Sequence, residues 1–363
     1  MNWGERPVIV MGHGLRASGA DASKLLWLGM PVLSSWQAAD LVDNWDLAYC
    51  GRPGIYGQRC ANRILYEADQ VVAIGCRMTP WMIGHAGLRP EQNLVMVDVD
   101  QHEAARFWPK VEWINQDAKE FVDSLQHANR QGWWEHWFKW RTDFPWIESG
   151  THDDANGYIN SYRFIQRLER LLRPDEIIAV DVGCRMCPVF QALRVKPPQR
   201  SLTSGGLGEM GCALPASIGA SFARGKGEVL CLVGDGGLMM NLQELQTVVH
   251  HQLPIKIIVF ANDGYAMIKG THRNLKIPYT GVDRASGISH PSFTKIAFGF
   301  GIQTGIVKTW DDFDRVMPQL LATKLPAILE VQIDPEQVYA PRLQPIKQPD
   351  GTFLPPRFCD LSP

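Results

Sequence analysis

The sequence predicts an α/β protein with two doubly wound parallel-sheet domains. Its 363 residues suffice for two domains of ordinary size, 45% of them are apolar, and short β-branched runs alternate with longer helical segments along both halves. Because the short runs are apolar throughout, we expect parallel strands that helices cover on both faces. We place the first domain at 1–150 and the second at 151–363.

The first half contains four candidate strands, each bounded by Gly, Pro or Asp. They cover 7–12, 31–36, 70–75 and 93–100, with helical segments at 19–29, 58–68 and 117–127. Residues 128–160 differ, because five tryptophans lie there among charged residues: Trp133, Trp134, Trp137, Trp140 and Trp146. We expect a helix whose aromatic face packs onto the domain; an interface with a partner is the alternative.

The second half continues the alternation with five candidate strands. They cover 176–183, 228–236, 254–263, 301–307 and 326–334, and helices are expected around 161–172, 211–223, 241–251, 291–298 and 310–323. In doubly wound sheets ligands bind beyond the carboxyl ends of the strands. Functional residues are therefore expected directly after each strand.

Composition and charge exclude several classes of protein. Since 36 Lys and Arg face 38 Asp and Glu, no basic field for nucleic acid is present. No apolar stretch approaches the roughly 20 residues of a membrane span, and the N-terminal segment lacks the features of a signal peptide, which favours a cytoplasmic enzyme. The eight cysteines are scattered, as reduced core residues are, and the pair Cys184 and Cys187 lacks the second ligand pair of a zinc site.

The sharpest local signal is a glycine-rich turn at the end of a candidate strand. Asp235 lies between Gly234 and Gly236 and is followed by Gly237, before a helix expected to begin near Asn241. Glycines at such a turn let backbone N–H groups approach a phosphate, whereas a carboxylate repels phosphate unless a cation lies between them. Mg²⁺ commonly bridges protein carboxylates and ligand phosphates.

Further oxygen ligands are expected from the next strand. It ends at Asn262, and Gly264 follows two positions later; 25 residues separate Gly236 from Asn262, enough for one turn, one helix and one strand. The carboxyl ends of parallel strands lie at the same edge of a sheet. The Asn262 side chain and the Gly264 carbonyl are therefore expected beside Asp235.

This constellation resembles the thiamine-diphosphate motif, in which GDG is followed by about 25 residues and Asn. The resemblance implies that Asp235, Asn262 and the Gly264 carbonyl bind Mg²⁺, which holds the cofactor diphosphate beside the glycine turn. A further segment, SGGLGEMGCALPASIGA at 204–220, is similar to GGLGTMGFGLPAAIGA of acetolactate synthases. There the resemblance implies that the Gly208 backbone contacts the aminopyrimidine and that Met210 wedges the cofactor into its bent shape. The same resemblance places three more residues against the cofactor: Tyr265, Ala266 and Met267.

The stretch AVDVGCRMCPVF at 179–190 looks like a family segment that touches the diphosphate. This resemblance implies that Gly183 lies near the phosphates. Cys184 and Arg185 stand where Gln and His are usual in the family. The Arg185 guanidinium is then expected to supply phosphate-binding charge instead.

The first half resembles the central domain of acetolactate synthases, from RPVIVMGHGLRASGA at 6–20 to NLVMVDVDQHEAARF at 93–107. In acetolactate synthase itself this domain binds FAD. Here residues 77–81 depart from the family's RFDDR, and His13 interrupts its glycine triplet. These departures weigh against FAD, whose binding stays the alternative.

The resemblance starts at the central domain, so the pyrimidine-binding domain of the family has no counterpart. That domain carries the glutamate that hydrogen-bonds the aminopyrimidine and promotes formation of the C2 carbanion. We therefore expect the large subunit of a split enzyme, which forms a homodimer within a hetero-oligomer and receives the glutamate from a separate pyrimidine-domain chain. A shortened form of a longer protein is the alternative.

The residues after Gly264 favour carboligation. Simple decarboxylases of the family carry NDGYTIE, whose Glu helps to release an aldehyde, whereas this chain has Ile268 at that position. An apolar residue there favours transfer of the acyl-anion equivalent from a 2-oxo acid to a second carbonyl. Residues 270–274, including His272, replace the QWQ of acetolactate synthases. The carbonyl acceptor is therefore expected to differ from pyruvate or 2-oxobutyrate. The alternatives are a simple 2-oxo acid decarboxylase and a non-catalytic regulatory protein that keeps the fold.

Overall fold

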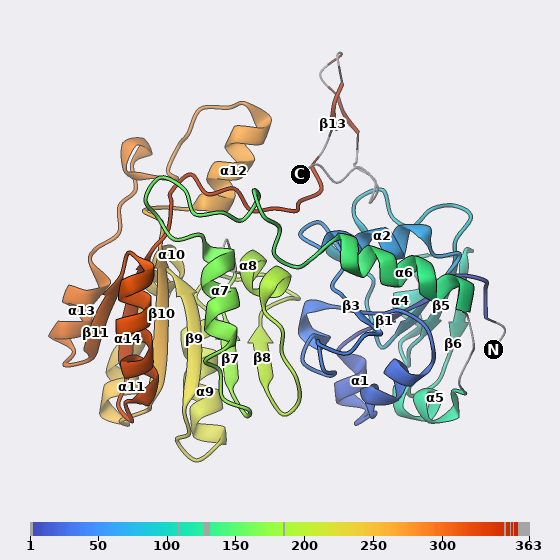
Figure 1. Ribbon diagram of the computed structural model, residues 1–363, viewed down its shortest axis with the longest axis horizontal. Coiled ribbons are helices and arrows are strands. Elements are labelled where there is room, and N and C mark those ends of the chain that lie inside the picture. Colours follow the sequence, from blue (N-terminus) through green and yellow to red (C-terminus); the bar gives the residue numbers. More distant parts are fainter. Residues whose placement is uncertain are drawn as a thin grey trace. The chain divides into compact units, whose positions relative to one another are not determined.

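The computed structural model describes residues 3–107, 109–126, 131–183, 186–344, 346–348, 350 and 352–354. The chain forms two compact units: Met1–Glu148 with Arg194–Pro197 and Ala340–Pro363, and Ser149–Leu193 with Pro198–Tyr339. Each unit contains a six-stranded parallel sheet interleaved with helices, as the ribbon in Figure 1 shows. This architecture confirms the predicted α/β class with two doubly wound sheets.

The sheet of the first unit has the strand order β3-β2-β1-β4-β5-β6. Its strands are β1 Pro7–Met11, β2 Val32–Ser34, β3 Tyr49–Gly51, β4 Gln70–Ile74, β5 Asn93–Val97 and β6 Val111–Ile114. The four predicted strands are confirmed, and β3 and β6 were not predicted. Periodicity cannot mark the three residues of β3, and β6 is an edge strand whose side chains are only partly buried.

Helices flank this sheet in the predicted alternation. They are α1 Gly14–Ala17, α2 Arg59–Glu67, α3 Pro80–Ile83, α4 Gln101–Ala105, α5 Ala118–Ser124 and α6 Gln131–Asp143. The helical segment expected at 19–29 forms a short 3₁₀ helix, Ala22–Trp27, whose first turn Asp21 caps by accepting from the Ser23 N–H. A second short 3₁₀ helix, Trp36–Ala38, follows β2.

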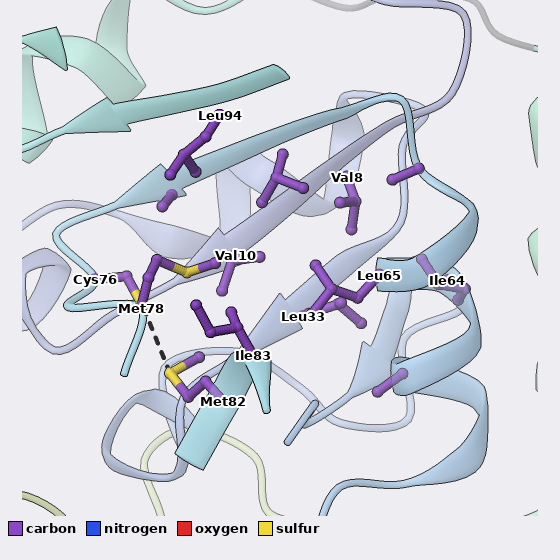
Figure 2. Close-up of a cluster of buried hydrophobic side chains, with 14 of the residues drawn as sticks. Val8, Val10, Leu33, Ile64, Leu65, Cys76, Met78, Met82, Ile83 and Leu94 are labelled. Atoms are coloured by element: carbon purple, nitrogen blue, oxygen red, sulfur yellow. Dashed lines mark hydrogen bonds between the residues drawn. The ribbon is translucent and has the colours of Figure 1, made fainter. Parts of the chain in front are cut away.

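Both faces of this sheet are buried, as apolar strands predict. Along β1, Val8 and Val10 belong to one buried cluster, and Ile9 and Met11 to the opposite one. Figure 2 shows the first cluster, in which side chains of β1, β2 and α2 meet and Cys76 Sγ lies 3.8 Å from Met82 Sδ. Burial raises the pKa of the Cys76 thiol to about 12, so it stays protonated and packs as an apolar group.

The tryptophan-rich segment forms α6, whose aromatic face packs onto the first unit. Trp133 and Trp137 join the cluster of Val8 and Val10, and Trp133 Nε1 donates to the Pro7 carbonyl at 2.8 Å. Trp134 points outward and is 40% exposed. The expected packing of an aromatic helix face is therefore observed within the unit.

Removing the buried ring of this helix is expected to destabilise the first unit. Trp137 is 1% exposed, so Trp137→Ala leaves a large cavity and lowers the free energy of unfolding by about 3–5 kcal/mol. The matched control Trp134→Ala, on the same helix, is expected to cost no more than about 1 kcal/mol. Urea unfolding of both variants checks this; equal losses would contradict the packing described.

The sheet of the second unit has the strand order β11-β12-β10-β9-β7-β8. Its strands are β7 Ile177–Val180, β8 Arg200–Thr203, β9 Val229–Gly234, β10 Ile255–Ala261, β11 Gln303–Val307 and β12 Ala327–Gln332. The five predicted strands are confirmed; the polar strand β8 was not predicted. Beyond the sheets, β13 Ile346–Lys347 pairs with β14 Phe353–Leu354.

The strand order reverses between β7 and β9, because β7 pairs with β8 on one side and with β9 on the other. Such a switch point leaves a crevice beyond the carboxyl ends of the two strands. The chain places Asp181 after β7 and Asp235 after β9. Candidate site residues therefore gather at the edge where doubly wound folds bind ligands.

The helices of the second unit are α7 Ser161–Glu169, α8 Met186–Ala192, α9 Ala213–Ala223, α10 Asp235–Met240, α11 Leu245–His250, α12 Ala266–Leu275, α13 Phe293–Gly299 and α14 Trp310–Ala322. Short 3₁₀ helices cover Leu242–Glu244 and Arg284–Ser286. The helix expected around 241–251 is present as the 3₁₀ helix Leu242–Glu244 followed by α11, whereas α10, which begins at Asp235, was not predicted. Asn241 ends α10, and its side chain donates to the Gly211 carbonyl at 2.8 Å.

In the described part of the chain, no helix combines the length and the apolar character needed to cross a membrane.

Candidate metal and cofactor site

Asp235 is a buried carboxylate that the backbone holds in place. It is 1% exposed at the start of α10. Its Oδ1 accepts from the Gly236 N–H at 2.8 Å, and its Oδ2 accepts from the N–H groups of Asn262 at 3.0 Å and Gly264 at 3.3 Å. Within the described residues no lysine or arginine forms an ion pair with it. A buried anion of this kind favours a nearby cation.

Asn262 and Gly264 bring further polar atoms to the same point. One amide atom of Asn262 lies 3.0 Å from Asp235 Oδ2, 3.3 Å from Oδ1 and 3.0 Å from the Gly264 carbonyl oxygen. If the amide nitrogen occupies this position, it donates to these oxygens. If the amide is rotated so that its oxygen occupies the position, a carboxylate, an amide and a carbonyl oxygen lie close together. Carboxylate, amide and carbonyl oxygens are the ligands that Mg²⁺ prefers, so the residues present fit this ion.

No group of three or more His, Cys, Asp or Glu side chains suited to a metal occurs among the residues that the structure describes. The candidate ion site is therefore the mixed set of one carboxylate, one amide and one backbone carbonyl. Such a set depends on backbone geometry as well as on side chains. The loop around Gly264 consequently matters as much as Asp235.

Gly264 has a backbone conformation that only glycine adopts readily. Its φ is +157°, and a Cβ there would lie 2.1 Å from the Val282 carbonyl oxygen. The same carbonyl accepts from the Tyr265 N–H at 2.8 Å, and Gly264 forms a bridge with Asp283. The Gly264 carbonyl is thus fixed by the segment that follows α12.

The structure brings Gly236, Tyr265 and Met210 together. A Cβ on Gly236 would lie 2.2 Å from Tyr265 Cε1 and 3.3 Å from Met210 Cε. Asn241 ties Gly211, next to Met210, to the end of α10. The methionine that the sequence assigns to the cofactor therefore lies beside the glycine turn.

The remaining cofactor residues occupy three separate positions. Gly208 has a φ of +75° in an open loop, where a Cβ would meet no atom within 4 Å, and its N–H donates to the Ser204 carbonyl at 2.9 Å. Ala266 and Met267 begin α12 and are half-buried. Gly183 has a φ of +110°, two residues after Asp181. Arg185, like Cys184, lies outside the described residues, so its role stays a prediction.

Asp181 and Gly237 form a contact that the sequence reasoning missed. Asp181 Oδ1 accepts from the Ala213 N–H at 3.4 Å and from Cys212 Sγ at 3.6 Å, which ties the start of α9 to the end of β7. A Cβ on Gly237 would lie 1.8 Å from Asp181 Oδ2. Burial and the Asp181 charge raise the pKa of the Cys212 thiol to about 11, so it is protonated at neutral pH.

His290 is the second residue that sequence reasoning missed. Its Nδ1 lies 3.6 Å from Asp235 Oδ2. The carboxyl-edge rule that identified Asp235 also applies to Asp181, so that signal was present in the sequence. No comparable signal marks His290, because it lies in irregular chain between α12 and α13.

The glycine-rich turn after β1 in the first unit is a packing element. A Cβ on Gly12 would lie 1.9 Å from the Gly75 carbonyl oxygen, and that oxygen accepts from the Gly14 N–H at 3.0 Å. These glycines let the turns after β1 and β4 approach closely. FAD binding by this unit, against which the departures in sequence weigh, stays the alternative.

Comparison with known proteins matches both units to one family. The family model "Thiamine pyrophosphate enzyme, central domain" matches residues 1–125, and "Thiamine pyrophosphate enzyme, C-terminal TPP binding domain" matches residues 181–331. The chain belongs to the thiamine pyrophosphate enzyme family. The segment matched to the C-terminal domain contains Asp235, Asn262 and Gly264. Thiamine pyrophosphate is another name for thiamine diphosphate.

Curated relatives of this thiamine pyrophosphate family member include acetolactate synthases. The chain is 29% identical to the acetolactate synthase isozyme 1 large subunit of Escherichia coli over 352 residues, which cover 95% of this chain and 61% of that protein. It is 28% identical to a probable acetolactate synthase large subunit of Methanocaldococcus jannaschii, covering 92% and 58%. Pyruvate oxidase of Lactiplantibacillus plantarum is 26% identical, covering 88% and 53%. The chain spans about three fifths of the length of the first two relatives.

Proposed function

We propose that this chain provides the diphosphate-binding part of a thiamine diphosphate- and Mg²⁺-dependent carboligase of the acetolactate synthase type. The observation that carries the proposal is the buried Asp235 carboxylate, which three backbone N–H groups fix beside the Asn262 amide and the Gly264 carbonyl. The similarity to acetolactate synthase large subunits supports the reaction type.

In this proposal the ion is held by Asp235, Asn262 and Gly264. Their oxygens would bind a cation that in turn holds the diphosphate, with the Asp235 carboxylate supplying the negative charge, and the glycines around Asp235 and Gly183 would allow backbone approach to phosphate oxygens. Thiamine diphosphate, when bound, would supply the nucleophilic carbon chemistry that acts on 2-oxo acids. Met210 and Tyr265, which meet at Gly236, form the apolar support for the cofactor.

We further propose that a partner chain holds the aminopyrimidine and supplies the catalytic glutamate, with a homodimer of this chain inside the resulting hetero-oligomer. Apolar side chains around the glycine turn support a partner surface, because three of them are strongly exposed. Leu207, in the loop before Met210, is 91% exposed, Met240 at the end of α10 is 50% exposed, and Ile268 on α12 is 47% exposed. A partner that covers them removes apolar surface from water.

Ile268 supports carboligation over simple decarboxylation. It lies in the first turn of α12, four residues after Gly264, and its side chain offers no proton. A carboxylic acid at this position would deliver a proton to the intermediate and favour aldehyde release. Ile268→Glu is therefore expected to shift products from the carboligation product towards free aldehyde, whereas Ile277→Glu, at an equally exposed isoleucine, is the matched control.

The experiment is reconstitution with candidate pyrimidine-binding proteins. The full chain is co-expressed with each candidate, and pyruvate consumption and products are measured with and without thiamine diphosphate and Mg²⁺. The proposal predicts turnover that requires the partner, the cofactor and the ion, with a product containing a new carbon–carbon bond. Cofactor binding without turnover in every complex would instead indicate a non-catalytic protein that keeps the fold. Flavin absorbance of the purified complex tests FAD binding separately.

A further inference from the structure

His290 places a buried nitrogen beside the candidate ion site. Its side chain is 8% exposed, and Nδ1 lies 3.6 Å from Asp235 Oδ2. Within the described residues Nδ1 makes no hydrogen bond. Buried polar atoms are rarely left without a partner, because burial removes their hydrogen bonds to water. The position therefore calls for a group that binds this nitrogen.

The fold holds the imidazole in place without any ligand. The Tyr265 ring packs against it edge to face, with ring centroids 5.7 Å apart at 76°. Pro291 follows and restricts the backbone, and Ser292 then caps α13 by accepting from the Lys295 N–H at 3.5 Å. His290 is thus preorganised, as the ligands of a metal site are.

His290 also lines a cavity of about 270 Å³ together with Asp235 and Asn262. The carboxylates of Asp263 and Glu330 line the same cavity. Glu330 accepts from the Phe293 N–H at 3.1 Å, and Asp263 lies 3.7 Å from Arg284. The carboxylates of Asp235 and Glu330 favour a cation over an anion there, whereas Asp263 is exposed and its charge is paired with Arg284.

The spacing between His290 and Asp235 is somewhat longer than that of neighbouring ligands of one ion. Octahedral coordination with bonds of about 2.1 Å separates neighbouring donor atoms by about 3 Å. Nδ1 lies 3.6 Å from Oδ2, so a shift of the imidazole by about 0.6 Å brings both atoms to the spacing at which one divalent ion binds them.

We propose that His290 Nδ1 is a further ligand of the ion held by Asp235, Asn262 and Gly264, and that it shifts the preference of the site from Mg²⁺ towards divalent transition metals. The proposal rests on the proposed function for the three oxygen ligands. Imidazole nitrogen binds Mn²⁺, Co²⁺ and Ni²⁺ with rising affinity, whereas Mg²⁺ prefers oxygen. A site with one nitrogen therefore discriminates between these ions more strongly than a site built from oxygen alone.

The test compares ion affinities of the full, metal-free chain in the presence of thiamine diphosphate. His290→Asn replaces the nitrogen ligand by an amide of similar size; it is expected to weaken Co²⁺ binding about tenfold or more and to change Mg²⁺ binding by no more than about twofold. The matched control is His250→Asn, at an exposed histidine on α11, which is expected to change neither affinity.

A spectroscopic readout does not depend on the variant. Pulsed electron paramagnetic resonance of the Mn²⁺-loaded wild-type chain is expected to show a nitrogen coupling that changes when the protein is labelled with ¹⁵N-histidine. Absence of that coupling while thiamine diphosphate binding still requires the ion would overturn the ligand role of His290 and leave the proposed function standing. A uniform loss of affinity for all ions in His290→Asn, without nitrogen coupling, would assign His290 to hydrogen bonding with Asp235 and also overturn the inference. If thiamine diphosphate binds with no ion, neither to the wild-type chain alone nor to any of its complexes with pyrimidine-binding proteins, the proposed function itself fails.

Discussion

Asp235→Asn is expected to weaken ion-dependent binding of thiamine diphosphate by at least about 100-fold while the second unit stays folded. Asn keeps the size of the side chain and one oxygen that can accept from the Gly236 N–H. It removes the negative charge. It also turns an NH₂ group towards the Asn262 and Gly264 N–H groups, which in the wild type donate to the carboxylate. Calorimetric titration of the full chain with thiamine diphosphate, with and without Mg²⁺, measures the effect.

The matched control is Asp263→Asn, the same change next to Asn262. Asp263 is exposed and has a φ of +54°, a conformation that Asn tolerates as well as Asp. The variant is expected to bind the cofactor within about twofold of the wild type, because within the described residues the Asp263 side chain makes only a long ion pair with Arg284. Similar losses in both variants would show that overall charge, and not the Asp235 ligand, governs binding.

Gly264→Ala is the second change with a large expected effect. The new methyl group would lie 2.1 Å from the Val282 carbonyl oxygen, in a region of φ that alanine avoids. The loop has to move, which costs about 3 kcal/mol of unfolding free energy and displaces the Gly264 carbonyl from the ion site. We expect a lower midpoint temperature of thermal unfolding and a lower ion-dependent affinity for thiamine diphosphate.

Gly219→Ala provides the control for a change from glycine to alanine. Gly219 lies in α9, exposed, with nothing within 4 Å of the new methyl group. Alanine stabilises helix interiors relative to glycine by up to about 1 kcal/mol, so this variant is expected to unfold at a slightly higher temperature and to bind the cofactor normally. Normal cofactor binding by Gly264→Ala would mean that its carbonyl does not hold the ion.

Much of the fold follows from local sequence, because a buried parallel strand must be apolar along its whole length. This rule found β1, β4, β9 and β10, whose residues are almost all buried. It missed β8, a polar four-residue strand that pairing with β7 stabilises. Strands of this kind form through their neighbours in the sheet and leave no periodicity of their own.

The candidate site likewise contains residues that local sequence predicts and residues that only tertiary contacts bring into place. Asp235 and Asn262 were predictable because each follows a strand, and parallel strands end at one edge. The contact of Met210 with Gly236 depends on how the loop before α9 folds back, which Asn241 decides through a tertiary hydrogen bond. His290 reaches the site from irregular chain, where no spacing rule connects it to Asp235.

The most direct test of the account is to locate the ion itself. Crystals of the full chain grown with Mn²⁺ and thiamine diphosphate give anomalous scattering that marks the ion. The account predicts a peak within bonding distance of Asp235, Asn262 and the Gly264 carbonyl, in contact with the cofactor diphosphate. A bound diphosphate whose ion lies away from these three residues would contradict it.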